Sequence, residues 1–401
     1  MNQPPLIVTH PQDALLQWPH FTPEDEAALL RILRDGNVST HPVIGELERA
    51  FAEATGRKHA LAHCNGTAGL LAAFHALGLA PGDEVLVPTA TFWASVLPMI
   101  WCGLVPVFCE SEPETLGLDP DDAERRITPR TKAMVIVHLW GLPCKVEKLL
   151  AVAHRHGLKV IEDASHAHGA SADGVPCGRF GDISVFSLQG DKLVPAGEGG
   201  VLLTDDETYL ERALCLGDIT RILRLPSAAR RFAATSFGVK TRIAPLSAAL
   251  GLQMLRRLPE TNAIRRENHD LLAQTLEPLG FNTFPAPPGQ ERVYFEWLIR
   301  PRDESLDLAR LLPLLTAMGC RVGLPRYPLL HQQPFFTEGY LAAVGRYPAG
   351  TTLPDYASLD LPCTARTNGQ MIRLPNFSHR GAQPLIAQYA QAFREAMALM
   401  A

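Results

Sequence analysis

Short apolar runs alternate with helical periodicities over the first half of the chain. The runs are rich in Val, Ile and Leu and are bounded by turn residues, a pattern typical of buried strands. They predict strands at 84–88, 105–108, 133–137, 159–162, 182–187 and 200–204. The segments between them predict helices near 93–101, 120–127, 146–156 and 207–215. Strands separated by helices in this way imply a largely parallel sheet covered on both faces.

Helical segments precede this region. Thr22 in the N-cap position, Pro23 after it and the acids that follow predict a helix start, and Gly36 predicts its end. Further helices are predicted at 46–55 and 68–77, with 60–62 as an apolar lead into the second of them.

The pattern changes in the last third of the chain. Two helices, 244–258 and 260–279, are predicted ahead of a Pro-rich stretch at 284–289. Beyond it we expect a strand at 294–300, a helix at 306–318, a Pro- and Gly-rich loop over 324–354 and a closing helix at 382–397. We therefore predict an α/β protein with a large domain, residues 1–260, built on a mostly parallel sheet, and a smaller α+β domain, residues 261–401.

Composition excludes several classes of function. The chain has 401 residues, of which 46% are hydrophobic and 20% charged, and its net charge of −5 offers no basic footprint for nucleic acid. No apolar run has the length of a membrane span, and the N-terminus lacks the pattern of a signal peptide, so we expect no membrane partner. The eight cysteines are scattered without a CxxC pair, which fits reduced thiols in the cytoplasm.

One lysine stands out from this background. Lys192 lies in a loop between the predicted strands 182–187 and 200–204, with the glycine-rich turn 197–200 behind it. Most lysines are solvated surface charges, and that interpretation is the more common one for a lysine considered alone. Held between two apolar strands, however, its amine would be partly desolvated and nucleophilic, as Schiff-base chemistry requires.

Two further segments favour the interpretation of Lys192 as a Schiff-base lysine over that of a surface charge. Asp163 ends a predicted strand, and the carboxyl ends of parallel strands are where α/β sheets bind ligands. Gly66, Thr67 and Ala68 open an apolar helix, where free N–H groups and the helix dipole favour a phosphate, although plain helix capping is the alternative. A carboxylate, a lysine and a phosphate cradle together form the constellation that binds pyridoxal phosphate (PLP).

Several short motifs follow one another along the chain. They are Asn65-Gly66-Thr67-Ala68, Pro81-Gly82-Asp83-Glu84-Val85, Pro88 with Thr91-Phe92, Val137-His138-Leu139-Trp140-Gly141, Glu162-Asp163-Ala164, FSLQGDK ending at Lys192 and GEGG at 197–200. With these motifs in this order, the chain resembles the DegT/DnrJ/EryC1/StrS family of PLP-dependent sugar aminotransferases. Weaker likeness continues toward the C-terminus at Tyr327-Pro328 and His331-Gln332-Gln333-Pro334. The resemblance implies PLP fold type I and a homodimer with active sites at the subunit interface.

The resemblance also implies roles for individual residues. Lys192 is expected to hold PLP as a Schiff base (the internal aldimine) and then to move a proton, while Asp163 pairs with the pyridine nitrogen. Some relatives carry histidine at the lysine position and act as dehydratases, so Lys192 favours transamination. Phe92 is expected to stack on the cofactor ring, against the alternative of a core phenylalanine. The phosphate contacts implied are Gly66, Thr67, Ala68, Ser187 and Gln189.

Two histidines allow a separate hypothesis. Asp163, His166 and His168 are residue types that bind zinc or iron. No third histidine lies near them and the family has no metal here, so we expect none. The ASHAHG segment resembles the branch of scyllo-inosose aminotransferases and 3-amino-5-hydroxybenzoate synthases, and His166 is predicted to contact the cofactor or substrate.

The chain departs from the family at two places. Lys240-Thr241-Arg242 replaces the common Asn-Tyr-Arg, whose asparagine reaches the partner subunit's phosphate, so Lys240 or Arg242 is expected to take that contact. Arg326 replaces a histidine common before Tyr-Pro, and its guanidinium suits a carboxylate or a polyol, with a surface arginine as the alternative. The predicted substrate contacts are His138, Trp140, Arg326, Tyr327 and His331.

Together these features predict a transaminase. The expected reaction moves an amino group from glutamate or glutamine, through pyridoxamine phosphate, to a ketone of a sugar nucleotide or cyclitol in secondary-metabolite or cell-surface sugar biosynthesis. A synthase of an aminated aromatic precursor, similar to 3-amino-5-hydroxybenzoate synthase, and a non-catalytic PLP-binding regulator remain as alternatives.

Overall fold

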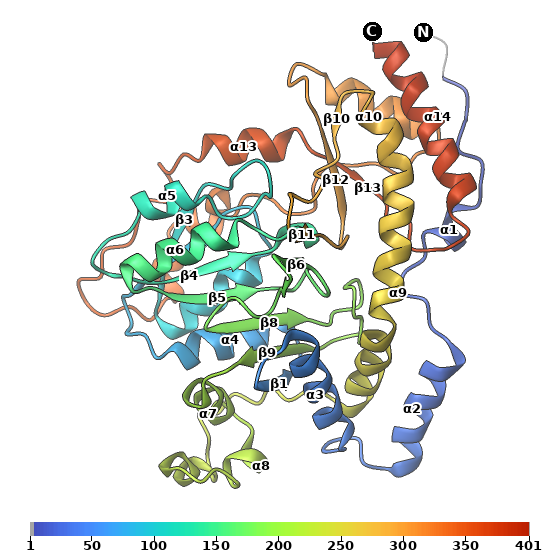
Figure 1. Cartoon of the computed structure of the whole chain (residues 1–401). Helices are drawn as coiled ribbons and strands as arrows, with labels where there is room; N and C mark the ends of the chain where they lie inside the picture. Colours follow the sequence, from blue (N-terminus) through green and yellow to red (C-terminus); the bar gives the residue numbers. More distant parts are fainter. Residues whose placement is uncertain (1–3, 401) are drawn as a thin grey trace.

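A seven-stranded sheet forms the centre of the computed structural model, which describes residues 4–400 (Figure 1). The strand order is β1-β9-β8-β5-β4-β2-β3. All neighbours from β8 to β3 pair in parallel, and β9 alone runs antiparallel to both of its neighbours. The strands are β1 (His59–His63), β2 (Glu84–Pro88), β3 (Val105–Cys109), β4 (Thr131–Val137), β5 (Lys159–Asp163), β8 (Ile183–Ser187) and β9 (Gly200–Thr204). The prediction of a mostly parallel sheet is confirmed.

Alternation along the strands builds a core on each face of the sheet. In β4, Val135 and Val137 belong to the core that contains the apolar side of α4 (Gly66–Leu77), whereas Met134 and Ile136 face a separate cluster. That second cluster contains apolar residues of α5 (Pro120–Arg125) and α6 (Val146–His156). Because successive side chains of a strand point to opposite faces, a fully apolar strand requires helices on both sides.

The first part of the chain contains further helices. They are α1 (Gln12–Leu15), α2 (Pro23–Asp35), α3 (Val43–Thr55), the 3₁₀ helices η1 (Trp93–Ser95) and η2 (Leu97–Cys102), η3 (Leu139–Gly141), α7 (Glu207–Cys215), α8 (Ile219–Ile222) and η4 (Ala228–Phe232). The single helix predicted at 93–101 is therefore wrong, because the chain forms two short 3₁₀ helices there. The predicted start of α2 is confirmed: Thr22 and Asp25 form a reciprocal capping box, and Gly36 ends the helix in the left-handed conformation.

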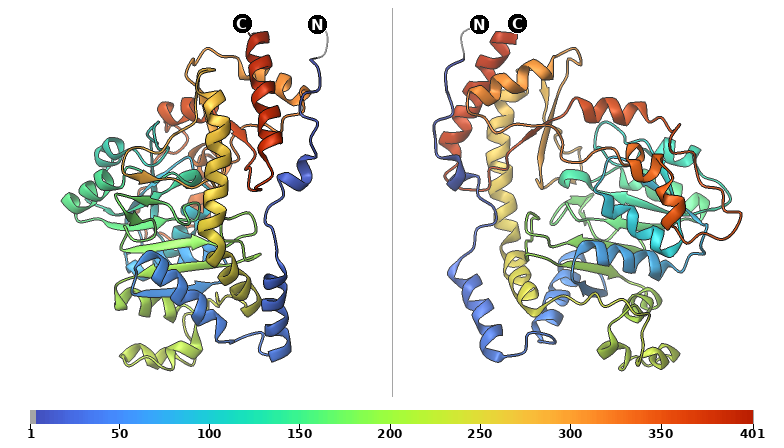
Figure 2. Two further views of the ribbon diagram at one scale, coloured as in Figure 1. Left: turned by 45° about the vertical axis from the view of Figure 1, so that its right-hand side comes forward. Right: turned by 180° about the vertical axis from the view of Figure 1, so that it is seen from behind.

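One long helix replaces the two predicted at 244–258 and 260–279. It is α9, Pro245–Leu276, with Pro259 inside it, and it runs most of the height of the molecule in Figures 1 and 2. Pro259 removes one backbone hydrogen bond, which predicted a break. Packing overrides that loss because Leu258 contacts the core of the large sheet while Leu272 and Leu276 enter another cluster.

That other cluster gathers around a small antiparallel sheet of β10 (Phe281–Asn282), β12 (Trp297–Pro301) and β13 (Ile372–Leu374). The helices α10 (Leu308–Ala317) and α14 (Gln383–Met400) cover it, and Val8 from the N-terminal segment joins it. The predicted strand 294–300 thus begins later, at Trp297. The division of the chain at 260/261 stays a prediction.

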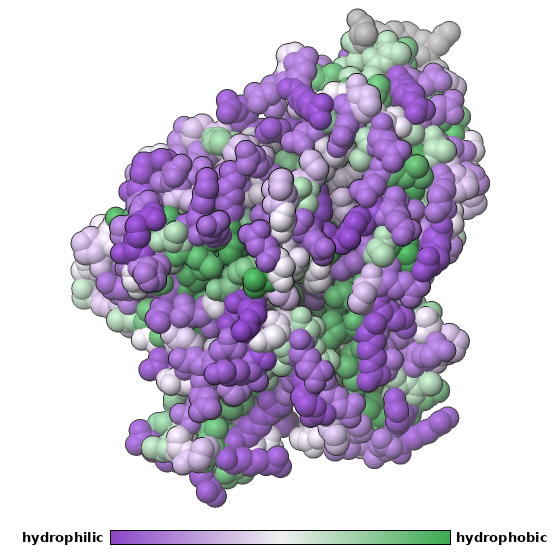
Figure 3. All heavy atoms as spheres, in the orientation of Figure 1, coloured by the Kyte–Doolittle hydropathy of each residue, from purple (hydrophilic) through white to green (hydrophobic). Residues whose placement is uncertain are grey.

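The segment after α10 returns to the large body. It contains the short helices η5 (Leu330–Gln332), α11 (Pro334–Thr337), α12 (Tyr340–Val344) and α13 (Pro362–Gly369), and Leu330, Phe336 and Leu341 pack into the core of the large sheet. A third small sheet joins β6 (Ser171–Ala172), β7 (Val175–Pro176) and β11 (Gln290–Glu291). The face shown in Figure 3 is mostly hydrophilic, with hydrophobic side chains gathered in a few patches. Within residues 4–400, no helix has both the length and the apolar composition of a bilayer span.

Candidate active site

A cavity of about 430 Å³ lies at the carboxyl ends of the parallel strands. Val137, Asp163 and Ser187, at the ends of β4, β5 and β8, line one side of it. The start of α4 and the loop that carries Lys192 line another, so three of the segments singled out in the sequence meet here. Phe92 and Trp93, with Phe295, Arg326 and Tyr327 from the second half of the chain, complete the wall. This is the position in which open α/β sheets bind ligands.

Lys192 is buried in this wall. Its side chain is 7% exposed, and its Nζ lies 4.1 Å from the centroid of the Phe295 ring. Burial lowers the pKa of Lys192 from 10.5 to about 8, against the opposing charge of Asp163. The loop is anchored from both sides, because the Lys192 N–H donates to the Gln189 carbonyl (2.8 Å) and the indole N–H of Trp18 donates to the Lys192 carbonyl (2.9 Å). The amine is thus held in place, and its lowered pKa makes the neutral, nucleophilic form easier to reach than in a solvated lysine.

Asp163 is held by two donors. Its Oδ2 accepts from the Ser95 hydroxyl at 2.7 Å, and its Oδ1 accepts from the Ser165 N–H at 3.1 Å. A further hydroxyl, that of Thr91, lies 2.9 Å from Ser95 Oγ. These two donors fix the orientation of the Asp163 carboxyl group in the cavity wall. Ser95 was not among the predicted site residues, although it is the one polar residue in the otherwise apolar segment 93–101.

The start of α4, which also lines the cavity, has the features of a phosphate site. The N–H groups of Gly66 and Thr67 lie in the first turn of α4, where an α-helix supplies no acceptor for them. The predicted contact at Ala68 differs, since its N–H already donates to the Asn65 side chain at 2.8 Å. A Cβ at Gly66 would lie 2.8 Å from the Ser187 Cβ, so glycine is what allows the Ser187 hydroxyl to approach the helix start. Gln189 also lines the cavity.

His166 belongs to an aromatic stack beside Lys192. Its ring lies 4.0 Å from that of Phe295, nearly parallel, and Trp140 stacks on Tyr327 at 4.8 Å. The Nδ1 of His166 accepts from the Trp140 N–H (3.3 Å), so the proton of the neutral ring is on Nε2, which faces the Tyr327 hydroxyl at 3.4 Å. Burial, aided by Lys192, lowers the pKa of His166 well below its usual value. This histidine therefore acts as a neutral hydrogen-bonding group.

Phe295, which the sequence did not single out, reaches the site through the backbone of Trp140 and Gly141. The Val293 N–H donates to the Gly141 carbonyl at 2.9 Å, and the Phe295 N–H donates to the Trp140 carbonyl at 3.3 Å. Trp140 has a positive φ of 60°, and a Cβ at Gly141 would collide with the Val293 carbonyl. The motif residues Trp140 and Gly141 thus dock the segment that carries Phe295. Phe92, which is 37% exposed, also lines the cavity, and the centroid of its ring lies 5.5 Å from that of Tyr327.

His168 points away from this arrangement. It packs against Phe51 and Phe186, and neither of its ring nitrogens finds a partner among the described residues. Burial lowers the pKa of His168 to about 3, with a smaller contribution from Lys192. The structure therefore does not bring His168 together with Asp163 and His166 as a set of metal ligands.

Besides Ala68, five predicted residues do not line the cavity, and one of them is Trp140, which instead docks the Phe295 segment as described above. His138 is fully buried, and its Nε2 donates to Glu162 at 2.9 Å while its Nδ1 accepts from the Cys144 N–H. His331 is buried against Thr89, with 2.7 Å between the ring Nδ1 and the hydroxyl. Both histidines are buried and neither lines the cavity, and their contact with substrate stays a prediction. Lys240 is exposed, and Arg242 contacts Ser39; both lie in the segment expected to meet a partner subunit.

Glu162, which precedes Asp163 in the sequence, anchors the end of β5 through hydrogen bonds. Its buried carboxylate accepts from the N–H groups of Phe180 (2.8 Å) and Gly181 (3.2 Å) and from the Ser184 hydroxyl (2.9 Å). His138, Glu162 and Cys177 lie close enough to share a metal ion. The carboxylate oxygens are already occupied by these donors, however, so we interpret the group as structural.

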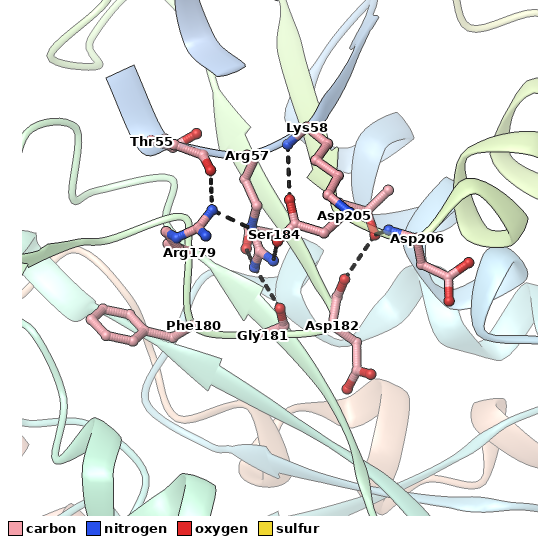
Figure 4. Close-up of polar contacts among 12 residues, drawn as sticks. Thr55, Arg57, Lys58, Arg179, Phe180, Gly181, Asp182, Ser184, Asp205 and Asp206 are labelled. Atoms are coloured by element: carbon pink, nitrogen blue, oxygen red, sulfur yellow. Dashed lines mark hydrogen bonds and ion pairs between the residues drawn. The ribbon is translucent and has the colours of Figure 1, made fainter. Parts of the chain in front are cut away.

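Arg57 completes this support (Figure 4). Its guanidinium donates to the Gly178 carbonyl (2.9 Å) and the Ser184 hydroxyl (3.1 Å), and pairs with Asp205 at 3.2 Å. The network fixes the loop that donates to Glu162, and hence the strand end that presents Asp163. A buried arginine with several acceptors specifies geometry in this way.

A parallel-rich α/β sheet with a buried lysine facing an oriented carboxylate defines an aminotransferase of PLP fold type I. The comparisons with known proteins agree. The model of the DegT/DnrJ/EryC1/StrS aminotransferase family matches residues 19–374. The chain belongs to this family, which makes it a PLP-dependent transaminase.

Individual relatives cover much of the chain. It is 33% identical over 396 residues to an L-glutamine:2-deoxy-scyllo-inosose aminotransferase of Streptomyces kanamyceticus, covering 95% of this chain and 93% of that one. It is 41% identical over 239 residues to the GDP-perosamine synthase of Caulobacter vibrioides, covering 59% and 62% of the two chains. The crystal structure of a 3-amino-5-hydroxybenzoic acid (AHBA) synthase superposes with a TM-score of 0.81 at 28% identity, covering 96% of this chain and 98% of that one.

Proposed function

We propose that this chain transfers an amino group from glutamine or glutamate to a ketone carbon of a sugar or cyclitol. The observation that carries the proposal is the pairing, in one cavity, of the buried Lys192 amine with the carboxylate of Asp163. Named relatives that act on an inosose and that make a GDP-linked amino sugar support this substrate class. Biosynthesis of secondary metabolites or of cell-surface sugars is the proposed setting.

The residues present fit PLP as cofactor. We propose that Gly66, Thr67 and Ser187 hold the phosphate, that Asp163 pairs with the ring nitrogen, and that Lys192 binds the aldehyde. The fit rests on the close approach of Ser187 to the start of α4, which Gly66 allows, and on the oriented Asp163 carboxyl group in the same cavity. Bound PLP supplies the electron sink that stabilises negative charge on the substrate carbon.

The chain's own residues then perform the following tasks. The Lys192 amine takes and returns a proton at the substrate carbon, because the lowering of its pKa to about 8 brings proton exchange by this group close to neutral pH. Ser95 and Ser165 keep the Asp163 carboxyl group oriented. Phe92 and the stack of Phe295 and His166 exclude water from the proton-transfer region.

We further propose a homodimer. The segment around α8 extends from the body below the sheet (Figure 1), and Ile219, Leu223 and Phe237 on it are exposed apolar side chains. Exposed apolar residues grouped on one projecting segment are typical of an interface. A second copy is the proposed cover, with Lys240 and Arg242 directed to the partner's phosphate. Light scattering on the purified protein gives the oligomeric state.

A colour assay tests the proposed function. The protein purified with PLP should show a visible absorbance band, and borohydride reduction should leave the cofactor mass on the peptide containing Lys192. L-Glutamine or L-glutamate should bleach the band, and an inosose or keto sugar should restore it. Lys192→Ala should lack the band, whereas Lys132→Ala, at an exposed lysine, should keep it. A protein that holds PLP but is bleached by no amino acid would instead support a non-catalytic regulator.

An aromatic-precursor synthase is the second candidate. The superposition with the AHBA synthase favours it, and the two candidates differ only in the acceptor. If cyclic enones restore the band and neither keto sugars nor inososes do so, the second candidate replaces the first.

A further inference from the structure

Arg265, on the long helix α9, is a buried cation without an anion beside it. The residue is 1% exposed, and no carboxylate among the described residues pairs with its guanidinium group. Burial lowers the pKa of Arg265 from 12.5 to about 9. An unpaired buried charge costs free energy that an apolar side chain of similar length avoids. What arginine supplies and an apolar residue lacks is a set of directed N–H donors on a flat group that stacks on aromatic rings.

The guanidinium group contacts the Trp18 ring and the backbone next to Phe295. Its central carbon lies 4.2 Å from the centroid of the Trp18 ring, a cation–π distance. Its Nη1 donates to the Tyr294 carbonyl at 2.7 Å, and its Nε donates to the Ser378 hydroxyl at 2.8 Å. One side chain of α9 therefore holds both the N-terminal segment and the segment that carries Phe295.

Both contacts lead to Lys192. The indole N–H of Trp18 donates to the Lys192 carbonyl at 2.9 Å, although 174 residues separate the two along the chain. The Phe295 ring follows directly after the carbonyl that Arg265 holds, and its centroid lies 4.1 Å from the Lys192 Nζ. One partner of Arg265 thus contacts the backbone of the lysine, and the other places apolar surface against its amine.

We propose that Arg265 is a positioning residue for the Lys192 amine. It acts through Trp18, which holds the lysine backbone, and through the Tyr294 carbonyl, which places the Phe295 ring against the amine. The proposal rests on the proposed function, because Lys192 is there the residue that moves the proton. A misplacement of about 1 Å slows such a step by up to about a hundredfold. Arg265 does not line the active-site cavity, so its effect on the reaction is indirect.

The first test measures the Lys192 amine in the cofactor-free protein. Competitive labelling with trace acetic anhydride, followed by mass spectrometry, gives the pKa of this amine from the pH dependence of its acetylation. Wild type should give a pKa of about 8, because burial lowers it. Arg265→Lys keeps the charge and loses the flat stacking group, whereas Trp18→Phe keeps a ring and loses the N–H donor. Each should admit water to the amine and raise its pKa by about one unit.

Two controls separate a displaced amine from a general loss of structure. Arg266→Lys, at the exposed neighbour of Arg265 on α9, should give the wild-type labelling profile. Circular dichroism at each pH shows which variants are folded. None of the substitutions alters the principal charged groups that act on the amine, which are Asp163, Arg326, Glu296 and Asp191.

The second test is the donor half-reaction of the PLP-loaded protein, followed by bleaching of the visible band with L-glutamine and with L-glutamate. Trp18→Phe should lower the limiting rate about tenfold, because the lost N–H acts on the lysine. The donor concentration that gives half of this rate should change by less than about twofold, since Trp18 does not line the active-site cavity.

Folded Arg265→Lys and Trp18→Phe proteins with the wild-type labelling profile would overturn the proposal, and so would a wild-type limiting rate in both. If neither amino acid bleaches the band of wild type, the proposed function fails. The labelling experiment then still decides whether Arg265 positions the amine, since it needs neither cofactor nor turnover.

Discussion

Replacing Lys192 by methionine should stabilise the cofactor-free protein. Burial lowers the pKa of this lysine from 10.5 to about 8, with Asp163 opposing the change. At about 1.4 kcal/mol per pH unit, that difference makes the ammonium form about 3 kcal/mol less favourable in the folded chain than in the unfolded chain. Methionine has a similar length and no charge, so Lys192→Met should raise the free energy of unfolding by about 2–3 kcal/mol at pH 7.

The pH dependence gives this prediction its sign. The folded pKa of Lys192 is lower than the unfolded one, so between about pH 8 and 10.5 the unfolded chain binds more protons and wild-type stability rises with pH. Below pH 8 both forms are protonated and the deficit is at its full size. The advantage of Lys192→Met should therefore shrink as the pH rises from 8 toward 10.5.

Urea unfolding followed by circular dichroism, at fixed protein concentration and at pH 7 and 9.5, measures both effects. Lys132→Met, at an exposed lysine, should change stability by less than about 0.5 kcal/mol at either pH. A destabilised Lys192→Met, or a stabilisation of equal size at both pH values, would show that the amine is not held desolvated in the folded chain.

Three further substitutions test the supports of the site. Ser95→Ala removes the 2.7 Å hydrogen bond that Ser95 donates to Asp163. Since a hydrogen bond to a charged group contributes about 1.5–3 kcal/mol, PLP binding should weaken about tenfold or more in a fluorescence titration. Unchanged affinity would contradict the role of Ser95. Glu162→Leu leaves its buried donors without an acceptor and should lower the free energy of unfolding by about 3–5 kcal/mol, measured with urea. Gly66→Ala places a Cβ 2.8 Å from that of Ser187 and should increase the fraction of purified protein that lacks cofactor, whereas a fully loaded variant would refute the packing argument.

The strands of the large sheet were predictable because their information is local. The ends of β2 and β9 match the predicted ranges, since each is an apolar run between turn residues. The unbroken helix α9 was not predictable, because Pro259 predicts a break when only the local sequence is considered. Its continuity depends on two separate cores that Leu258 and Leu272 reach, and neither core is visible in the sequence of the helix.

The residues of the candidate site also fall into those that a local sequence pattern predicts and those that it does not. Lys192 and Asp163 were recognisable because each occupies a definite place next to a strand, and the structure places both in the lining of one cavity. Trp18 and Ser95 were missed because their partners lie 174 and 68 residues away, at separations for which no local pattern exists. His138 shows the converse, since a residue within a family motif turns out to support Glu162 from inside the core.

The unbroken course of α9 has a consequence for how the sequence can change in length. Each residue of an α-helix advances the axis by about 1.5 Å and turns it by about 100°. One residue inserted between Pro259 and Leu272 would therefore swing the upper apolar stripe, with Leu272 and Leu276, roughly a quarter-turn away from its cluster. Loops such as 346–354 have no such phase to preserve, so length variation among natural and engineered versions of this chain should collect there and be absent from the middle of α9.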